Sequence, residues 1–452
     1  MKTSQWLAVV KISTSEKLHP EQCGSRDFVR RDRSIWYRIL PIVFWVVALA
    51  TVPILSSVQE PATGWDLHVY ANAVQSLRAG HDPYADGIAV QRAVHSQRLL
   101  HPDPFAAVPF TYVYSPITLP PLRLVSSWPP LISYTFYWLI YAIGSIAIVW
   151  VALQATEPKE RRTFSLIAPA ALFFPGFLLT MVLLSGNLSY ILYGLIFTGA
   201  LLGWRRGRWT WFYLATVIAS CYKAPLLSLL AIPVLSARKQ WLPTCLAGVA
   251  GIVLFAIQPL VWPSAFHHYM EAVELQFSYN HDFGLSPSGL LGNTLFFHGF
   301  PYSFASTLCY VLYAPIVFGT LLYLARRFFA GHFSLQQWIP VMLLGVILLN
   351  PRIKEYDVAV LSLPMALVAW RLFARGNTFA RTALETSLFF IAVNAIASNS
   401  PYSWQPTEGT LLVGLFVAGC WHLLHPAGNT DPGVSGQTVS IPRQKSTTLA
   451  MS

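Results

Sequence analysis

The stretch GWDLHVYANAVQSLRAGHDPY, residues 64–84, gathers groups that can move a proton or bind a polar ligand. Asp66 opens it, and His68, Tyr70, His81 and Asp82 follow. Behind Asp66 the apolar residues recur at helical spacing, which predicts a short amphipathic helix at a membrane interface. A carboxylate at this position can act as a general base. An aspartate at a helix start also often caps the helix, and the two roles are compatible.

Two later segments place cations between apolar runs. Lys223 lies in CYKAPLL (221–227), where Pro225 interrupts the helix. A lysine at bilayer depth costs roughly 2.5–3.5 kcal/mol on insertion scales and usually faces a cavity or a partner. The alternative is that its ammonium reaches the outer surface. The second segment, NPRIKEYD (350–357), contains Arg352, Lys354, Glu355 and Asp357, and indicates either an anion site or a turn with solvated ion pairs.

Three further segments carry polar or aromatic groups. FTYVYSPITLPPL (110–122) brings Tyr112 and Tyr114 before an apolar run, as an aromatic interface belt or as the lining of a lipid or sugar groove. In SGNLSY (185–190), Asn187 can cap the next helix or point into a cavity. HDFGLSPSGLLGN (281–293) supplies hydrogen-bonding groups suited to a polyol, namely His281, Asp282, Ser286, Ser288 and Asn293.

The elements that position these groups are membrane helices. The chain has 452 residues, of which 54% are hydrophobic and 11% charged, and its mean hydropathy is +0.50. Soluble domains carry about twice that charged fraction. Long continuous apolar runs exclude the alternating pattern of a β-barrel, and lipid requires each helix to satisfy its own backbone. We therefore predict an all-α integral membrane protein.

The apolar runs predict a bundle of about 12 transmembrane helices. The expected elements are 37–58, 131–153, 164–184, 187–203, 209–221, 223–236, 242–262, 304–325, 336–350, 356–373, 380–398 and 408–424. The elements 209–221 and 223–236 are short. Counting them as one helix would invert the orientation of everything downstream.

The distribution of Lys and Arg decides the orientation, because cytoplasmic flanks collect these residues. With two crossings at 209–236, the inside segments are both termini and 157–162, 204–209, 237–240, 325–329 and 371–381. They hold most of the 30 Lys and Arg, which explains the net charge of +11 without nucleic acid. The sequence thus predicts a multi-pass plasma (inner) membrane protein with both termini cytoplasmic. It also predicts long outer loops at 59–130, with short interfacial helices, and at 263–303.

The remaining organisation follows from composition. Residues 1–36 read as a basic cytoplasmic tail, 37–425 as one membrane domain and 426–452 as a disordered tail. The five cysteines have no paired spacing, so we expect neither a disulfide framework nor a metal site. The outer histidines also lack the spacing of zinc ligands.

Taken in order, these segments resemble polytopic GT-C glycosyltransferases, most of all glycosyltransferase family 87 (DUF2029), which includes polyprenyl-phosphate-mannose-dependent α-mannosyltransferases. The resemblance covers roughly residues 40–400. It rests on Asp66 with Tyr70 and GHDPY, FTYVYSPITLPPL, SGNLSY, YKAPLL, SPSGLLGN and NPRIKEYD. Two details depart from the family pattern. No glutamine precedes Asn187, and Ala224 separates Lys223 from Pro225.

The resemblance implies an inverting hexosyltransferase with a GT-C-like bundle. A sugar, with mannose favoured, would pass from a polyprenyl-phosphate donor to a glycolipid or glycan acceptor at the outer face, without cofactor or metal. Asp66 would be the general base. Lys223, Arg352, Lys354 and His281 would bind the donor phosphate. The sugar, acceptor and lipid groove would involve His68, Tyr70, His81, Asp82, Tyr112, Tyr114, Asn187, Asp282, Ser286 and Glu355.

Two other function classes fit the same composition. A lipid or sugar transporter or flippase places ionisable groups on discontinuous helices, often within an internal repeat. The pair 209–221 and 223–236 hints at such broken helices, although no two-fold repeat is visible. A structural partner in envelope assembly would need no pocket that brings Asp66 near the cations.

Overall fold

The computed structural model describes residues 65–100, 111–158, 160–161, 164, 185–280, 283–375, 377–397 and 404–425. Both predicted tails, the expected element 37–58, nearly all of 164–184, and the candidate site residues His281 and Asp282 lie outside the described residues. Throughout the described ranges the regular structure is helical, with no strand.

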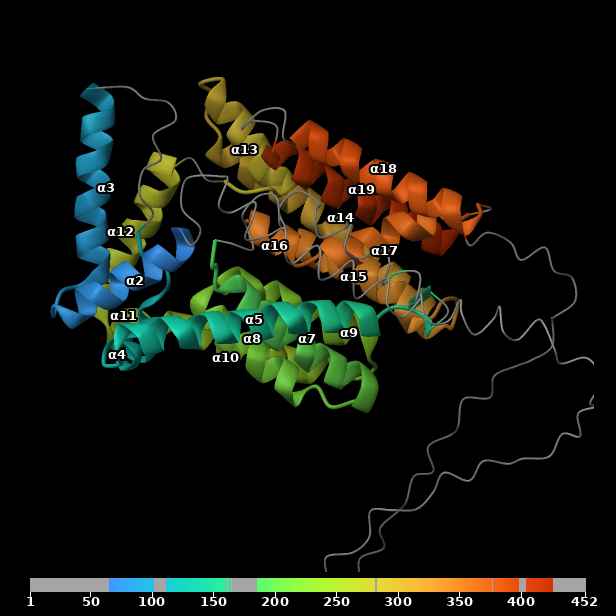
Figure 1. Cartoon of the computed structure of the whole chain (residues 1–452), viewed down its shortest axis with the longest axis horizontal. Coiled ribbons are helices and arrows are strands. Elements are labelled where there is room, and N and C mark those ends of the chain that lie inside the picture. The colour runs from blue at the N-terminus through green and yellow to red at the C-terminus, as the bar shows by residue number, and fades with distance from the viewer. Residues whose placement is uncertain are drawn as a thin grey trace, which may run out of the picture. The chain divides into compact units, whose positions relative to one another are not determined.

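The segments predicted as the first outer loop and as part of the second form a layer of short helices, which we call the outer layer. They are α2 (Trp65–Arg78), α3 (Pro83–Leu100), the 3₁₀ helix η1 (Pro116–Thr118), α4 (Leu119–Ser126) and α12 (Pro263–Asn280). Helix α2 packs on α3 and α4, and α3 packs on α12 (Figure 1). Two ion pairs hold α3 and the residue before it against α12. The Nδ1 of His268 lies 2.6 Å from an Asp82 oxygen, and Arg92 binds Glu271. The two predicted outer loops therefore belong to one structural layer.

A first group of apolar helices follows. It comprises α5 (Pro130–Gln154), α7 (Ser189–Arg206), α8 (Thr210–Tyr222), η2 (Ala224–Leu230), α9 (Ala231–Ser236), α10 (Trp241–Ala256) and α11 (Gln258–Val261). Helix α7 packs against both α5 and α8 (Figure 1). Glycine makes the first contact close, because a Cβ added at Gly194 would lie 2.7 Å from the Cα of Gly144. Small residues at such crossings allow helix backbones to approach in lipid.

The second group comprises α13 (Pro287–Phe297), α14 (Ser303–Phe329), α15 (Leu335–Leu348), α16 (Glu355–Ala359), α17 (Ser362–Phe373), α18 (Phe379–Ala397) and α19 (Trp404–Leu424). Helix α15 packs against α14, α17 and α19 (Figure 1). Nearly every residue of α15 and α17 is buried, so these two helices form the core of this group.

Within the described ranges, four helical spans are long and apolar enough to cross a membrane: Pro130–Gln154, Trp241–Val261, Ser303–Phe329 and Gln405–Leu424. Large apolar side chains are exposed along them, including Leu131, Leu246 and Ile316, as expected of surfaces that contact lipid. The prediction of a helical membrane protein is confirmed at this level. The same part of the chain contains four shorter apolar helical segments: Thr210–Tyr222, Ala224–Ser236, Leu335–Leu348 and Ser362–Phe373.

The segments 210–222 and 224–236 form a hairpin and not one continuous helix. Lys223 joins them in an extended conformation, with φ −141° and ψ 91°. The Tyr213 hydroxyl, in the first turn of α8, donates to the side chain of Gln240, just after α9, over 3.0 Å, so the far ends of the hairpin lie close together. The 13 residues of α8 rise only about 20 Å, against about 30 Å for a hydrocarbon core.

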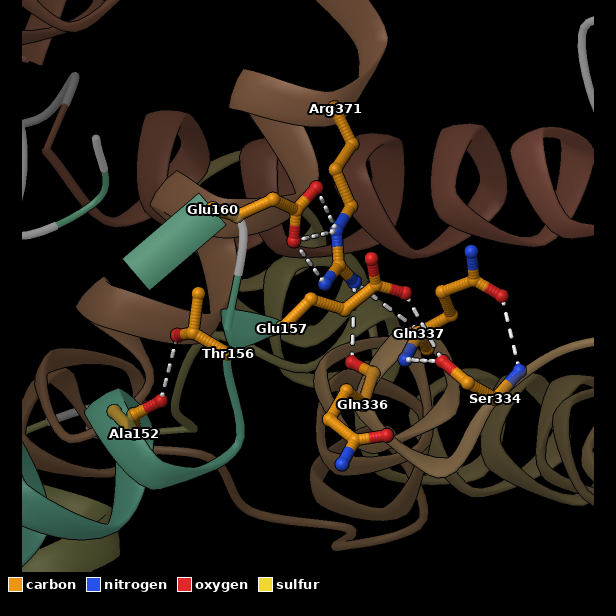
Figure 2. Close-up of polar contacts among 8 residues, drawn as sticks. All are labelled: Ala152, Thr156, Glu157, Glu160, Ser334, Gln336, Gln337 and Arg371. Atoms are coloured by element: carbon orange, nitrogen blue, oxygen red, sulfur yellow. Dashed lines mark hydrogen bonds and ion pairs between the residues drawn. The ribbon is translucent and has the colours of Figure 1, made fainter. Parts of the chain in front are cut away.

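A polar cluster around the buried Arg371 joins α15 and α17 to the segment after α5 (Figure 2). The Arg371 guanidinium donates to both oxygens of Glu160, the shortest contact being 2.8 Å, and to the Gln336 carbonyl over 3.2 Å. The Ser334 hydroxyl, which caps α15, donates to Glu157 over 3.1 Å. We refer to these five residues as the base cluster. The Trp338 indole of α15 donates to the Leu235 carbonyl over 3.0 Å, so this cluster lies toward the end of the hairpin away from Lys223.

The base cluster unites segments that the charge pattern assigns to one side of the membrane. Glu157 and Glu160 belong to 157–162, and Arg371 begins 371–381. Nearby, the Arg238 side chain of 237–240 donates to the Phe329 carbonyl of 325–329 over 3.2 Å. The fold thus brings together the segments that the sequence groups as inside.

Candidate active site

Asp66 lies in the first turn of α2, as its second residue. Its backbone N–H donates to the Ser185 carbonyl over 3.1 Å, and the N–H of Leu67 donates to the same oxygen over 3.2 Å. The expectation that Asp66 caps its own helix is therefore corrected. Its side chain is one position inside the helix, and a turn 119 residues later in the chain supplies the backbone acceptor for the first N–H groups.

Burial raises the pKa of Asp66 from 3.8 to about 6, while hydrogen bonding to the Asn187 and Ser185 side chains and the charge of Lys354 oppose the rise. The charge of Glu355 acts in the same direction as burial. The fold thus brings NPRIKEYD within electrostatic range of Asp66, although almost 290 positions separate them in the chain.

Tyr70 and Tyr114 lie within electrostatic range of Asp66. The hydroxyls of Tyr70 and Tyr114 lie 2.6 Å apart, and the N–H of Leu188 donates to the Tyr70 oxygen over 3.1 Å. Tyr114 is only half-buried and lies within electrostatic range of Asp66 and Arg352. Both Tyr70 and Tyr114 were expected in a groove, and both lie within electrostatic range of the candidate base.

Lys223 is held by an ion pair at the tip of its hairpin. Its Nζ lies 2.6 and 2.7 Å from the two oxygens of Asp357, which is fully buried. Asp357 also accepts from the Tyr193 hydroxyl over 2.9 Å and from the Lys354 N–H over 2.9 Å. The Tyr356 ring lies 4.4 Å from the same Nζ. Lys223 therefore faces a partner inside the fold, with its side chain only 16% exposed.

The loop after α12 and NPRIKEYD pair directly through their backbones. The Leu285 N–H donates to the Ile353 carbonyl over 2.7 Å, and the Ser286 hydroxyl donates to the Pro351 carbonyl over 2.7 Å. Ser286 also caps α13 by accepting from the Gly289 N–H. Gly284 has φ +84° and packs against the Ile353 carbonyl, where a Cβ would lie 2.5 Å from the oxygen. In this structure Ser286 thus positions Arg352 and Lys354 through their shared loop.

Glu355 is linked to a residue that the sequence did not single out. The Gln405 amide donates to Glu355 over 3.0 Å and accepts from Asn293 over 3.2 Å. Glu355 lies 3.6 Å from the Lys354 ammonium. Gln405 and the fully buried Glu408 open α19. The sequence analysis did not single out Gln405 and Glu408, because they adjoin an apolar run. Two polar residues one helical turn apart at the start of that run could have identified them.

Other predicted site residues belong to the outer layer. His68 is exposed, and the exposed His81 lies 3.5 Å from Asp86. Asp82 binds His268 and accepts from the Tyr84 N–H over 2.9 Å. Tyr112 is buried, with its hydroxyl 2.6 Å from that of Thr118. These contacts hold the layer together and keep Tyr112 away from any open surface.

We call the group formed by Asp66, Tyr114, Lys223, Arg352, Lys354, Glu355 and Asp357 the charged chamber. It combines a carboxyl group of raised pKa with cations supplied by two distant segments. Such a set can accept a proton and stabilise a developing anion. Within the described ranges, no three His, Cys, Asp or Glu side chains converge as metal ligands would. Comparison with known proteins matched no family model, no curated protein and no solved structure.

Proposed function

We propose that this chain is an inverting, polyprenyl-phosphate-sugar-dependent hexosyltransferase of the GT-C type. It moves a sugar, with mannose favoured, from a lipid-phosphate donor to a glycolipid or glycan acceptor at the outer face of the membrane. The single observation that supports this proposal most is the position of Asp66. A carboxyl group of raised pKa lies within electrostatic range of Lys354, in a chamber that also contains Arg352 and Lys223.

In the proposed reaction Asp66 takes the proton of the acceptor hydroxyl. The acceptor oxygen forms a bond to the sugar C1, and the bond between C1 and the phosphate oxygen breaks. The electron pair of that bond leaves with the lipid phosphate, which becomes a monoester. Arg352 and Lys354 are the candidates to stabilise the charge that develops there, and such stabilisation is strongest in a site that excludes water.

Charge balance within the chamber supports this assignment. With Asp66 ionised, three carboxylates, Asp66, Glu355 and Asp357, balance three cations, Lys223, Arg352 and Lys354. The donor phosphodiester carries one negative charge, and the leaving monoester approaches two. Because Asp66 becomes neutral as the phosphate gains charge, the total charge of the chamber with its ligand stays nearly constant. The proton transfer and the departure of the phosphate thus favour each other.

The topology that goes with this proposal has about 12 crossings and both termini in the cytoplasm. The base cluster then lies at the inner face, and the charged chamber lies toward the outer face. Hairpins 210–236 and 335–373 end at Lys223 and at NPRIKEYD, and both are shorter than a full span. Their tips therefore lie below the outer surface, at a depth that suits a phosphate attached to a membrane lipid.

The proposal is tested by incubating the purified protein with a panel of polyprenyl-phosphate sugars and measuring released lipid phosphate. Asp66→Asn is expected to lower turnover by at least 10²-fold, because general-base help contributes about 10²–10⁴. Asp86→Asn is the matched control, since Asp86 is a half-exposed carboxylate of the outer layer that lies outside the charged chamber. Normal turnover in Asp66→Asn would remove Asp66 from the mechanism, and no turnover with any donor would remove the function.

One observation favours transport as the second candidate. Lys223 and Asp357 form an ion pair between two interrupted hairpins, and transporters often bind substrates at such breaks. A transporter would move a labelled lipid-phosphate sugar across proteoliposomes without breaking it. Recovery of intact donor in the opposite leaflet, with no free lipid phosphate, would favour this candidate over the transferase.

A further inference from the structure

The Asp357 carboxylate is the meeting point of three separate elements. Its two oxygens bind the Lys223 ammonium at 2.6 and 2.7 Å, at the tip of hairpin 210–236. One of these oxygens also accepts from the Tyr193 hydroxyl of α7 over 2.9 Å. The other accepts from the Lys354 N–H over 2.9 Å, within its own loop. Because the side chain is fully buried, these contacts take the place of water around both oxygens.

The contact with Lys354 fixes the backbone from which that cation extends. Lys354 comes directly before α16, and Asp357 is the third residue of this helix. From that position a carboxylate can reach back to the N–H of the residue before the helix. The Lys354 carbonyl in turn accepts the N–H groups of Asp357 and Val358 over 2.9 and 3.2 Å. Both backbone polar groups of Lys354 are therefore held by α16, and the start of its side chain has a defined direction.

The Lys223 ammonium is bound in the pair. Of its three N–H groups, two are needed for the two Asp357 oxygens, and the Tyr356 ring lies 4.4 Å from the same nitrogen. A phosphate oxygen that took over these N–H groups would leave the buried carboxylate without its counter-charge, which is strongly unfavourable. Lys223 is therefore suited to stabilise Asp357 and poorly suited to bind a donor.

The charges of the chamber lead to the same assignment. Besides the candidate base, the chamber contains three cations and two carboxylates, an excess of one positive charge. Lys223 and Asp357 cancel each other within their pair. The excess therefore comes from Arg352, Lys354 and Glu355, and these residues offer one net positive charge to a phosphodiester that carries one negative charge.

We propose that Asp357 is a positioning residue that holds Lys354 for the donor phosphate, with Lys223 as its buried counter-charge and not as a phosphate ligand. The proposal rests on the function proposed above and extends it to a carboxylate outside the reacting atoms. Lys223 stabilises the buried carboxylate, and the carboxylate in turn holds the Lys354 N–H.

Two variants of the full-length protein test the role of Lys223. In Lys223→Met, the buried Asp357 carboxylate has lost its counter-charge and competes with the phosphate for Lys354, so kcat for sugar transfer should fall by about tenfold or more. Adding Asp357→Asn to Lys223→Met returns the excess of one positive charge and keeps an amide oxygen for the Lys354 N–H. This asparagine double variant should recover kcat to within about threefold of the parent protein.

A leucine double variant, Asp357→Leu with Lys223→Met, tests the role of the acceptor. Leucine is similar in size to asparagine and gives the same charge balance, but it cannot accept from the Lys354 N–H. Its kcat should be about tenfold lower than that of the asparagine double variant at nearly equal KM, because Lys354 then acts from a less defined position. If the leucine variant gives too little folded protein, Asp357→Ala replaces it in the same background.

Tyr193→Phe is the matched control for the loss of a hydrogen bond to Asp357. It removes the Tyr193 hydroxyl, which donates to the same carboxylate, and leaves the acceptor of the Lys354 N–H in place. It should lower thermal stability without lowering kcat by more than about twofold. A tenfold loss of kcat in this variant would show that any weakening of the carboxylate lowers turnover, and it would overturn the specific role assigned to the Lys354 contact.

Amide hydrogen exchange supplies a readout that needs no turnover. Mass spectrometry of a peptide that covers residues 352–358 should show faster exchange in the leucine double variant than in the asparagine double variant, because the Lys354 N–H has lost its acceptor. The Tyr193→Phe variant should exchange in this peptide as the parent protein does.

This proposal and the proposed function fail in different ways. An asparagine double variant that is as inactive as Lys223→Met alone overturns the proposal, because Lys223 then acts as a ligand. Equal kcat or equal exchange in the two double variants also overturns it. Faster exchange in the leucine double variant, when the parent protein transfers no sugar from any donor, supports the hold of Asp357 on Lys354 and overturns the proposed function.

Discussion

The Lys223 ammonium lies 2.6 and 2.7 Å from the two carboxylate oxygens of Asp357, across 134 positions of the chain. This ion pair joins the tips of two hairpins and is almost completely removed from water. Two buried charges of opposite sign stabilise each other only while both are present. The effect of a substitution at Lys223 or Asp357 on stability therefore depends on whether the other charge remains.

Removing one partner of this pair should be costlier than removing both. Lys223→Ala leaves the Asp357 carboxylate buried without its counter-charge, and we expect a loss of about 3–5 kcal/mol. Lys223→Ala combined with Asp357→Asn should restore part of that stability, because the neutral amide leaves no buried charge unpaired and keeps an acceptor for the Tyr193 hydroxyl. The measurement is thermal or denaturant unfolding in detergent as a double-mutant cycle. Additive effects of the two substitutions would contradict a coupled pair.

The stability of the protein should depend on the ionisation of Asp66. Its folded pKa of about 6 lies above the 3.8 of an unperturbed aspartate, so the folded state binds the proton more tightly than the unfolded state does. The stabilising contribution is complete below pH 3.8 and is lost as the pH rises through 6. The shift corresponds to at most about 3 kcal/mol.

This dependence is measured as the melting temperature of the detergent-solubilised protein from pH 4 to 8. The difference between the parent protein and Asp66→Asn should grow in favour of the variant as the pH rises, because asparagine carries no charge to bury. A constant difference across this range would show that Asp66 does not titrate there.

The contact between α5 and α7 should be intolerant of even one methyl group. A Cβ at Gly194 would lie 2.7 Å from backbone atoms of Gly144. Backbone atoms within two packed helices cannot shift to relieve this overlap without loss of stability. Gly194→Ala is expected to destabilise the fold by about 1–3 kcal/mol. Gly319→Ala in α14 is the control, since its Cβ meets nothing within 4 Å and alanine favours the helix. Equal melting temperatures of the two variants would contradict the close crossing.

The orientation can be tested with single cysteines in a background that lacks the five natural ones. His298→Cys and Arg208→Cys both replace exposed residues, the first in the second outer loop and the second in a basic turn. In intact cells a membrane-impermeant maleimide should label only the cysteine at 298. Labelling at 208 should need permeabilised cells. The reverse pattern would place the charged chamber on the cytoplasmic side.

The positions of the membrane helices followed from hydropathy because lipid offers the backbone no hydrogen-bonding partner. Expected elements such as 131–153 and 304–325 coincide with α5 and α14. Charge asymmetry further favoured two segments over one at 210–236, and the extended backbone of Lys223 is consistent with that choice. Hydropathy and the distribution of charge are local or additive along the chain. Both can therefore be read from a single sequence.

Contacts between distant segments could not be predicted in the same way. Nothing near Lys223 identifies Asp357 as its partner, because the pairing depends on how two hairpins pack. Ser286 was a candidate ligand for a polyol, and the fold uses it instead to hold the loop of Arg352. Asp82 and His268 likewise bind each other across two loops. Polar residues on a loop indicate that their side chains need hydrogen-bonding partners. The identity of those partners depends on how distant segments pack, and it is visible only in the fold.

The shortness of the two central hairpins has a consequence for the bilayer itself. Helix α15, with 14 residues, rises only about 21 Å, roughly 9 Å less than an average hydrocarbon core. A deficit of that size is met by local thinning of the lipid or by water above the tips. In the proposed orientation the outer leaflet would then be thinner over Lys223 and NPRIKEYD. A lipid headgroup would reach these residues by moving inward, while its hydrocarbon tail stayed among the neighbouring lipid tails.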